Sequence, residues 1–462
     1  MTEIKSAALE LGTERIRKLL VQYAVPAIIA MTASSLYNMV DSIFIGLGVG
    51  PMAISGLALT FPLMNLAAAF GSLVGVGAAT LISMRLGQKD YASAQYILGN
   101  VVVLNFIIGL GFGLVTLLFL DPILYFFGAS EATIGYARDY MSIILMGNVV
   151  THMYLGLNSV LRSAGHPRKS MYATINTVVI NTILDPLFIY GFGWGIRGAA
   201  IATVLAQIIA LIWQFHILSD KSELLHFRRG IYRLRRKIVR DILAIGMSPF
   251  LNQMAMMVVQ VVMNNTLTFY GASSVYGKDI PLACAGIISK VGMVFFSVII
   301  GLSQGLQPII SFNYGAQQYG RVREAYLKTL RIAVAFSCIA FLCFQILPRQ
   351  IIGLFSTGTE SEEYFRFAEE YFRIYFFFTF INCIQPLTAN FFTAIGKASR
   401  GIFISLTRQI IFLLPLLLLL PAMFGIDGVM FAGPVADMAA ATMAALFMRA
   451  EFRRMKAVQP AA

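Results

Sequence analysis

Long apolar segments alternate with short polar ones along almost the whole chain. There are twelve such segments, near residues 19–45, 55–83, 93–119, 136–161, 169–191, 197–217, 241–269, 281–311, 324–347, 366–393, 401–421 and 426–448. Each is long enough to cross a bilayer, because about 20 mostly apolar residues in a helix span the hydrocarbon core. The segments lack the alternation over about ten residues that membrane β-barrel strands show. The pattern therefore predicts an all-α polytopic membrane protein with twelve transmembrane helices.

Basic residues concentrate in the polar segments on one side of the predicted membrane. The chain is 58% hydrophobic and only 12% charged, with a net charge of +13. Lys and Arg are densest between 218 and 240, and the positive-inside rule places this segment and both termini in the cytoplasm. That rule explains the basic charge without a nucleic-acid partner, and no aromatic-rich basic motif suggests one. We therefore expect lipid, and not nucleic acid, to surround the protein.

The basic segment 218–240 divides the chain into a first lobe, 1–217, and a second lobe, 241–462, with six predicted spans each. The segment between Gly77 and Gly87 resembles the one between Gly305 and Gly315, and Pro26 corresponds to Pro249. An even number of spans per half makes both lobes enter the membrane in the same direction. The repeat thus predicts two six-helix bundles related by a pseudo-two-fold axis along the membrane normal. Two such bundles can rock about a cleft, which favours a transporter over an enzyme or receptor.

Two acidic residues lie inside apolar segments of the first lobe, and ionisable groups in a span are functional candidates by default. Asp41 and Asp185 both lie roughly 8–9 Å from the outer end of their helices at 1.5 Å per residue. Thr203, on the sixth span, reaches the same depth. Asn181 and Tyr37 each lie one helical turn before one of the two acids, on the same helix face.

This cluster concentrates oxygen atoms around two carboxyl groups in a medium of low dielectric constant. Pro186 adds to it, because proline leaves one upstream carbonyl without its helical hydrogen bond. Two neighbouring carboxylates cannot both stay ionised cheaply there, so a proton or a bound cation should neutralise the pair. The hypothesis is a cation-coupling site. The alternative is a structural polar network that ties the first, fifth and sixth spans together.

The sequence resembles the MATE (multidrug and toxic compound extrusion) family over essentially its whole length, and its MepA-like bacterial branch most of all. The residues that carry the resemblance are Pro26, Asp41-Ser-Ile-Phe-Ile-Gly46, Gly87-Gln88, Leu161-Arg-Ser-Ala-Gly165, Asn181-Thr-Ile-Leu-Asp185-Pro186 and Gly195-Ile-Arg-Gly-Ala-Ala200. The resemblance implies a two-lobe fold and cation-driven export of amphipathic, mostly cationic drugs across the bacterial inner membrane. It also implies a first-lobe cation site, which holds H⁺ or Na⁺ at Asp41, Asn181, Asp185 and Thr203, with Tyr37 beside it.

The resemblance to the NorM-like branch of the family is incomplete. That branch carries an acidic residue eight positions after the proline of the seventh span, where this chain has Met257. It also carries an aspartate in the tenth span, where this chain offers only Asn382 and Gln385. We therefore expect coupling to rest on the first lobe, with helices bending at Pro26 in the first span and at Pro186 in the fifth.

Polar and charged residues also occur within the second-lobe spans. The seventh span faces the cleft in relatives, which makes Gln253, Met257, Gln260 and Asn264 candidates for the substrate cavity. Asp437 is a further candidate, as an anchor for a drug cation. The depths of Lys290 and Asp437 also favour a structural ion pair between them, and we expect Arg408 to extend to the cytoplasmic surface.

The prediction is therefore a monomeric multidrug antiporter that exports drugs or toxic metabolites and needs no cofactor besides its coupling ion. Three alternatives remain. A lipid-linked precursor flippase would prefer a strongly cationic cavity, for which the spans supply few basic residues. An intramembrane enzyme would need a nucleophile–base set or a metal motif such as H-E-x-x-H, and the spans show none. A passive channel would differ only in lacking flux against a gradient.

Overall fold

The computed structural model describes residues 7–277, 279–354 and 361–458, and within these ranges the chain is helical and contains no strand. The helices of the first half are η1 (Leu9–Gly12), α1 (Ile16–Gly48), α2 (Pro51–Gly87), α3 (Tyr91–Leu118), α4 (Leu120–Phe126), α5 (Ile134–Met146), α6 (Asn148–Ser163), α7 (Pro167–Pro186), η2 (Leu187–Gly191) and α8 (Gly195–Leu218). Those of the second half are α9 (Arg236–Ala272), α10 (Asp279–Gly315), α11 (Tyr319–Ile346), α12 (Pro348–Gly353), α13 (Glu362–Tyr375), α14 (Thr379–Asn382), α15 (Ile384–Ala394), α16 (Ala398–Leu406), η3 (Thr407–Leu413), α17 (Leu414–Phe424) and α18 (Ile426–Val458).

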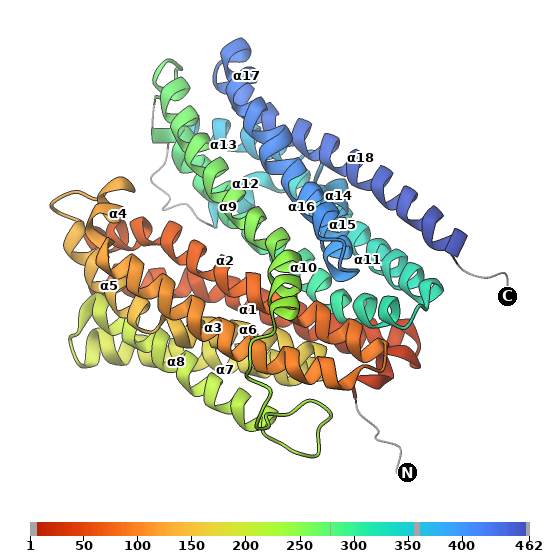
Figure 1. Cartoon of the computed structure of the whole chain (residues 1–462). Helices are drawn as coiled ribbons and strands as arrows, with labels where there is room; N and C mark the ends of the chain where they lie inside the picture. The colour runs from red at the N-terminus through yellow and green to blue at the C-terminus, as the bar shows by residue number, and fades with distance from the viewer. Residues whose placement is uncertain (1–6, 278, 355–360, 459–462) are drawn as a thin grey trace.

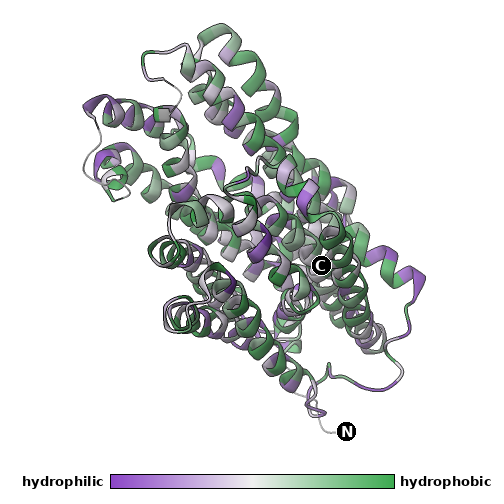
Figure 2. Ribbon diagram, turned by 90° about the vertical axis from the view of Figure 1, so that its left-hand side faces the viewer, coloured by the Kyte–Doolittle hydropathy of each residue, from purple (hydrophilic) through white to green (hydrophobic). Residues whose placement is uncertain are grey.

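The predicted class, an all-α polytopic membrane protein, is confirmed. In the described ranges, ten helices are long and apolar enough to cross a membrane, and the pair α5–α6 supplies an eleventh crossing. Large apolar side chains are exposed on the outer faces of the bundles, among them Phe106, Ile212, Ile339 and Leu419. Figure 2 shows the same pattern, with hydrophobic residues along the helices and hydrophilic residues gathered towards helix ends and loops. Such a surface suits lipid contact.

Two of the predicted spans are broken where a continuous helix was expected. The fourth bends by 57° between α5 and α6, at Gly147. A Cβ at Gly147 would lie 2.7 Å from the Val204 side chain, so the close approach to α8 requires glycine. The tenth is divided into α13, α14 and α15, and Pro386 occupies the first turn of α15, where its missing N–H costs nothing.

The two halves match in their second and third helices and in the turn between them. Helices α2 and α10 each have 37 residues, and α3 and α11 each have 28. The turns after α2 and α10 place Lys89 at φ 60° and Gln317 at φ 58°. A residue other than glycine is uncommon in this left-handed region, so its recurrence at matching positions reflects the internal repeat. Figure 1 shows α1–α8 as one bundle and α9–α18 as another. The division at 218–240 stays a prediction.

The two bundles pack closely against each other through α1 with α10 and α2 with α9. A Cβ at Gly246 would lie 1.7 Å from the carbonyl oxygen of Leu73, and one at Gly305 would lie 2.4 Å from the Cα of Ala24. Only glycine allows such backbone contact. Both glycines lie in the halves of their helices that are nearer the two termini. The close seam between the bundles is therefore on the side of the termini.

Contact between the bundles weakens towards the opposite side of the membrane. Two contacts between the bundles lie farthest from the side of the termini among the described residues. One is the hydrogen bond between Thr32 Oγ1 and Ser297 Oγ at 3.4 Å, and the other is the ring contact between Phe70 and Phe250, with 4.9 Å between centroids. Beyond these contacts the ribbons of the two bundles diverge (Figure 1). The conformation is thus closed on the side of the termini and separated on the other.

Candidate cation-coupling site

The fifth predicted span provides the first part of the site. Asn181 and Asp185 lie one turn apart on α7, and both are buried, with 1% and 0% of their surface exposed. The Asn181 side-chain amide donates hydrogen bonds to both carboxylate oxygens of Asp185 at 3.1 Å. The amide therefore orients the carboxyl group, and it leaves its own carbonyl oxygen available.

Helix α1 brings the second carboxyl group to the same place. Tyr37 and Asp41 lie one turn apart on α1, which packs along α7. The Tyr37 hydroxyl donates to Asp185 Oδ2 at 3.5 Å and accepts a hydrogen bond from the Asn181 amide. Asp41 is 8% exposed and lies close enough to Asp185 for their charges to interact. The structure therefore brings together all four of these predicted residues.

Thr203, on α8, borders the cluster. Its hydroxyl donates to the Ala199 carbonyl at 3.1 Å, and its oxygen lies beside the phenol groups of Tyr37 and Tyr140. Tyr140, fully buried on α5, was not predicted from the sequence. It carries no charge in the membrane and belongs to no motif, and its neighbours Arg138 and Asp139 form ion pairs with Asp121 and Arg197 at the helix ends. The sequence therefore held no signal for it.

The cluster contains oxygens that no donor satisfies. Asp41 Oδ1 and Asn181 Oδ1 are both buried, and neither has a hydrogen-bond partner among the described residues. A buried acceptor without a donor is costly, and each such group calls for an explanation. A proton on Asp41 or a small hard cation at these oxygens would lower that cost, because hard cations prefer oxygen ligands. The residues present therefore fit either ion.

The two prolines predicted to bend helices differ in their local structure. Pro186 ends α7, and the chain continues as the π-helical turn η2, in which the Phe192 N–H bonds to the Leu187 carbonyl at 3.0 Å. Such turns are rare and frequently lie at functional sites. Pro26 lies within α1, which runs without interruption from Ile16 to Gly48. Bending at Pro26 stays a prediction.

The predicted cavity residues of the second lobe share one face of α9. Gln253, Met257, Gln260 and Asn264 follow one another at spacings of three and four residues, and all are at least partly exposed. The Gln260 amide donates to Asn264 Oδ1 at 2.9 Å. This row gives α9 a polar stripe whose role in substrate binding stays a prediction.

Asp437 does not belong with that row, and two predictions about buried charge are wrong. Asp437 is 3% exposed, accepts a hydrogen bond from Arg408 Nε at 2.5 Å and another from Asn382 Nδ2 at 3.1 Å. Arg408 is therefore buried in an ion pair and does not extend to the surface. Lys290 is exposed and, within the described ranges, forms no ion pair. We accordingly remove Asp437 from the cavity candidates.

The π-helix η3 explains this correction. Arg408 lies in η3, whose wider turn rotates the side chains relative to a regular α-helix. The prediction from the sequence considers only the depth of Arg408, which lies near the cytoplasmic end of the eleventh span and so within reach of the surface. The π-helical segment instead turns its guanidinium towards Asp437 on α18.

A comparison with known protein families identifies the chain. The MatE family model matches residues 26–187 and 253–419, which together make up more than half of the chain. The chain belongs to the MatE family. Similar relatives of this MatE protein include the "Multidrug export protein MepA" of Staphylococcus haemolyticus (strain JCSC1435), 28% identical over 92% of each chain. The protein of that name from Staphylococcus aureus (strain NCTC 8325 / PS 47) is 27% identical over 93% of each chain.

Solved structures agree on the fold of this MatE protein. A structure described as "Crystal structure of MATE in complex with MaL6" matches with a TM-score of 0.91 at 22% identity, over 98% of this chain and 100% of the other. One described as an "Outward-facing conformation of a multidrug resistance MATE family transporter" matches with a TM-score of 0.90 at 23% identity, over 98% and 99%. These structures show that the protein has the MATE fold. Membership of the MatE family makes it a membrane transporter and not an enzyme.

Proposed function

We propose that this MatE protein is a multidrug efflux antiporter that exports amphipathic, mostly cationic compounds in exchange for inward H⁺ or Na⁺. Family membership and the relatives named as multidrug export proteins support the export of drugs. The observation that carries the coupling mechanism is the buried pair Asp41 and Asp185, in which Asp41 Oδ1 and the neighbouring Asn181 Oδ1 lack hydrogen-bond donors among the described residues. No resident cofactor is part of the proposal.

Ion binding would alter the forces between α1 and α7. While both carboxyl groups are ionised, their repulsion in a low-dielectric interior is costly. Neutralising one group lets two hydrogen bonds hold α1 against α7, one from the Asn181 amide to the Tyr37 hydroxyl and one from that hydroxyl to Asp185. Releasing the ion restores the repulsion. Occupancy of the site therefore favours one arrangement of the first bundle over another, as ion coupling requires.

Orientation supplies the direction of exchange. The basic linker and both termini lie on one side of the described structure, and we propose that this side is cytoplasmic, in the inner membrane of a bacterium. The bundles are separated on the other side, so the arrangement is open outward. The coupling ion then enters the cluster from outside as the drug leaves, and it is released inward after the bundles rock. We propose that a single chain carries out this cycle.

A lipid-linked precursor flippase is less well supported. The polar stripe on α9 holds amides and no cation, and the buried Arg408 is already neutralised by Asp437. An anionic pyrophosphate headgroup would find no strong counter-charge in either place. A cationic drug meets no such obstacle, because it encounters amide oxygens and polarisable methionine.

The test is export of a cationic amphipathic dye from proteoliposomes with an imposed pH or Na⁺ gradient. We expect wild type to respond to one of the two gradients. The Asp41→Asn variant should lose roughly tenfold or more of the ion-driven rate, a change of about 1.4 kcal/mol in the barrier. Asp121→Asn is the matched control, because it removes an equivalent carboxylate from a half-exposed ion pair with Arg138.

Two results would count against the proposal. Full export with full ion dependence in Asp41→Asn would overturn the coupling site. If Asp41→Asn instead lowers thermal stability while the rate per folded molecule is unchanged, the cluster is a structural network. Equilibrium binding of ²²Na⁺ to wild type and to Asp41→Asn then separates a sodium site from a proton site.

A further inference from the structure

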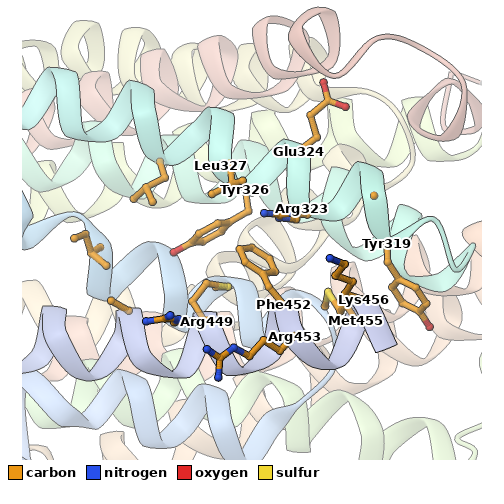
Figure 3. Close-up of a pocket in the computed structure, with 15 residues that line it drawn as sticks. Tyr319, Arg323, Glu324, Tyr326, Leu327, Arg449, Phe452, Arg453, Met455 and Lys456 are labelled. Carbon is orange, nitrogen blue, oxygen red and sulfur yellow. The ribbon is translucent and has the colours of Figure 1, made fainter. Parts of the chain in front are cut away.

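A second polar site lies far from the cluster, on the side of the termini. The first turns of α11 and the last turns of α18 enclose a hollow of about 770 Å³, to which Ile384 of α15 contributes (Figure 3). The transport mechanism does not use this hollow, because it lies on the outer part of the second bundle and not between the bundles. Its lining combines basic side chains with apolar ones.

The rim of the hollow is strongly basic. Arg323, Arg449, Arg453 and Lys456 line it, and none of them forms an ion pair with a residue of the described ranges. The acidic residue in the lining, Glu324, is engaged with Lys328 at 2.6 Å. The rim therefore carries a surplus of positive charge that the protein itself does not neutralise.

Glu451, near the same end of α18, is the acidic partner of two other cations. It is 1% exposed and binds both Lys397 and Arg400. It is thus committed to cations away from the hollow and cannot balance the rim. Four cations close together repel one another, so an anion from outside the protein would stabilise the arrangement.

The wall of the hollow is apolar and extends into the depth of the membrane. Leu327, Leu330, Met448 and Phe452 form it, and the Arg323 guanidinium lies over the Phe452 ring at 5.8 Å (Figure 3). Leu330 lies six residues into the predicted ninth span, 324–347, roughly 9 Å along the helix at 1.5 Å per residue. The headgroup layer on one side of a bilayer is only about 5–8 Å thick. The wall thus reaches the level of the acyl chains.

We propose that this hollow is a binding site for one anionic phospholipid of the adjacent leaflet. Its phosphate lies among Arg323, Arg449, Arg453 and Lys456, and one acyl chain lies along Leu327, Leu330 and Phe452. Guanidinium groups bind phosphate oxygens in pairs, and basic pockets between helix ends on the cytoplasmic side are suited to anionic headgroups. A soluble phosphate or a nucleic acid would leave the apolar wall exposed to water. The site is independent of the proposed export function.

Native mass spectrometry of the full-length protein, released from detergent containing phosphatidylglycerol and phosphatidylcholine, tests the proposal. The triple variant Arg449→Gln/Arg453→Gln/Lys456→Gln removes three rim cations. The control Arg17→Gln/Lys237→Gln/Arg454→Gln removes the same charges from exposed positions outside the hollow. We expect wild type and control to retain one more phosphatidylglycerol than the triple variant, and none to retain phosphatidylcholine selectively.

Two results of that experiment would overturn the proposal. One is equal retention of phosphatidylglycerol by the triple variant and the control. The other is release of the bound lipid by millimolar glycerol phosphate, because a soluble anion would then account for the site.

A second measurement does not depend on the triple variant. A Leu327→Trp reporter should be quenched more strongly by phosphatidylglycerol brominated on its acyl chains than by brominated phosphatidylcholine. The two native tryptophans, Trp194 and Trp213, belong to the first bundle and supply a constant background. Equal quenching by the two lipids would contradict a headgroup-selective site.

Discussion

Buried charges are neutralised in different ways in the two bundles. In the first, Asp41 and Asp185 lie together among an amide and hydroxyl groups, and no cation of the described residues is bonded to them. In the second, Asp437 is bonded to Arg408 and to Asn382. A carboxylate that is already neutralised by a protein cation attracts a second cation only weakly. This difference favours the first bundle as the place where an exchangeable ion binds.

The Arg408–Asp437 pair should be important for stability. Removing one partner leaves the other charge buried and unpaired, so Arg408→Leu should cost about 3–5 kcal/mol of unfolding free energy. The double variant Arg408→Leu/Asp437→Leu should recover most of that loss. Unfolding in detergent micelles followed by circular dichroism measures both. Lys290→Met is the control, with an expected change within about 0.5 kcal/mol because Lys290 is exposed. A double variant no more stable than Arg408→Leu would contradict this account.

At the level of helices, irregular elements lie where the buried charges are. The π-helical turn η2 follows Asp185 and Pro186, and η3 contains Arg408. Helix α7 and the α16–η3–α17 segment are the fifth crossings of their halves, so both halves of the repeat have a π-helical turn in the fifth crossing. The contacts between the bundles are regular by comparison, since α1, α2, α9 and α10 are long helices that meet at glycines. The bundles can therefore move as units while the sites within them stay intact.

Those glycines should determine whether the bundles close on the side of the termini. In Gly246→Ala the added methyl would lie 1.7 Å from the Leu73 carbonyl oxygen, so α2 and α9 must separate. We expect longer distances between spin labels at Gln88 and Gln318, measured by pulsed electron resonance in a background without the native cysteines. Gly286→Ala is the matched control, because a Cβ there meets no atom within 4 Å. The same distance distribution in both variants would show that the seam is not so tightly constrained.

At the level of the whole molecule, the basic linker, the start of α1 and the end of α18 share one side, and the separated ends of the bundles share the other (Figure 1). Helix α1 leaves the side of the termini, α2 returns to it, and α3 leaves it again, so the segment between α4 and α5 lies opposite. The distribution of Lys and Arg then orients the entire molecule, because basic loops are retained in the cytoplasm.

Labelling of single cysteines in intact cells checks this orientation. In a background without native cysteines, a membrane-impermeant maleimide should label Ala132→Cys, between α4 and α5, but not Lys221→Cys, in the linker. Both positions are exposed, so both should react once the cells are permeabilised. Reaction at Lys221→Cys with protection at Ala132→Cys would reverse the proposed topology, and with it the direction of exchange.

Much of the fold could be predicted from the sequence, because the bilayer acts on each span separately. Ten of the twelve predicted crossings are single helices, or a helix continued by a π-helical turn, and the fourth and tenth are broken at positions where hydropathy gives no signal. The cluster was predicted in part. The spacing of Asn181 and Asp185 places both on one helix face, so the sequence predicted that they lie together. Tyr140 belongs to the cluster because α5 packs against α8, and the sequence did not predict this contact. The α9 row shares one face, as its spacing requires.

The sequence by itself determined the class of the protein, its internal repeat and the presence of two acids in the first-lobe spans, because hydrophobicity and charge are properties of each segment alone. Only the tertiary structure decided which groups meet. Arg408 pairs with Asp437 and does not reach the surface, Lys290 forms no ion pair with a described residue, and Thr203 lies beside Tyr140. Such pairings depend on how each helix is rotated about its axis. That rotation is determined by π-helical turns and by glycine contacts with neighbouring helices, which the pattern within one span does not contain.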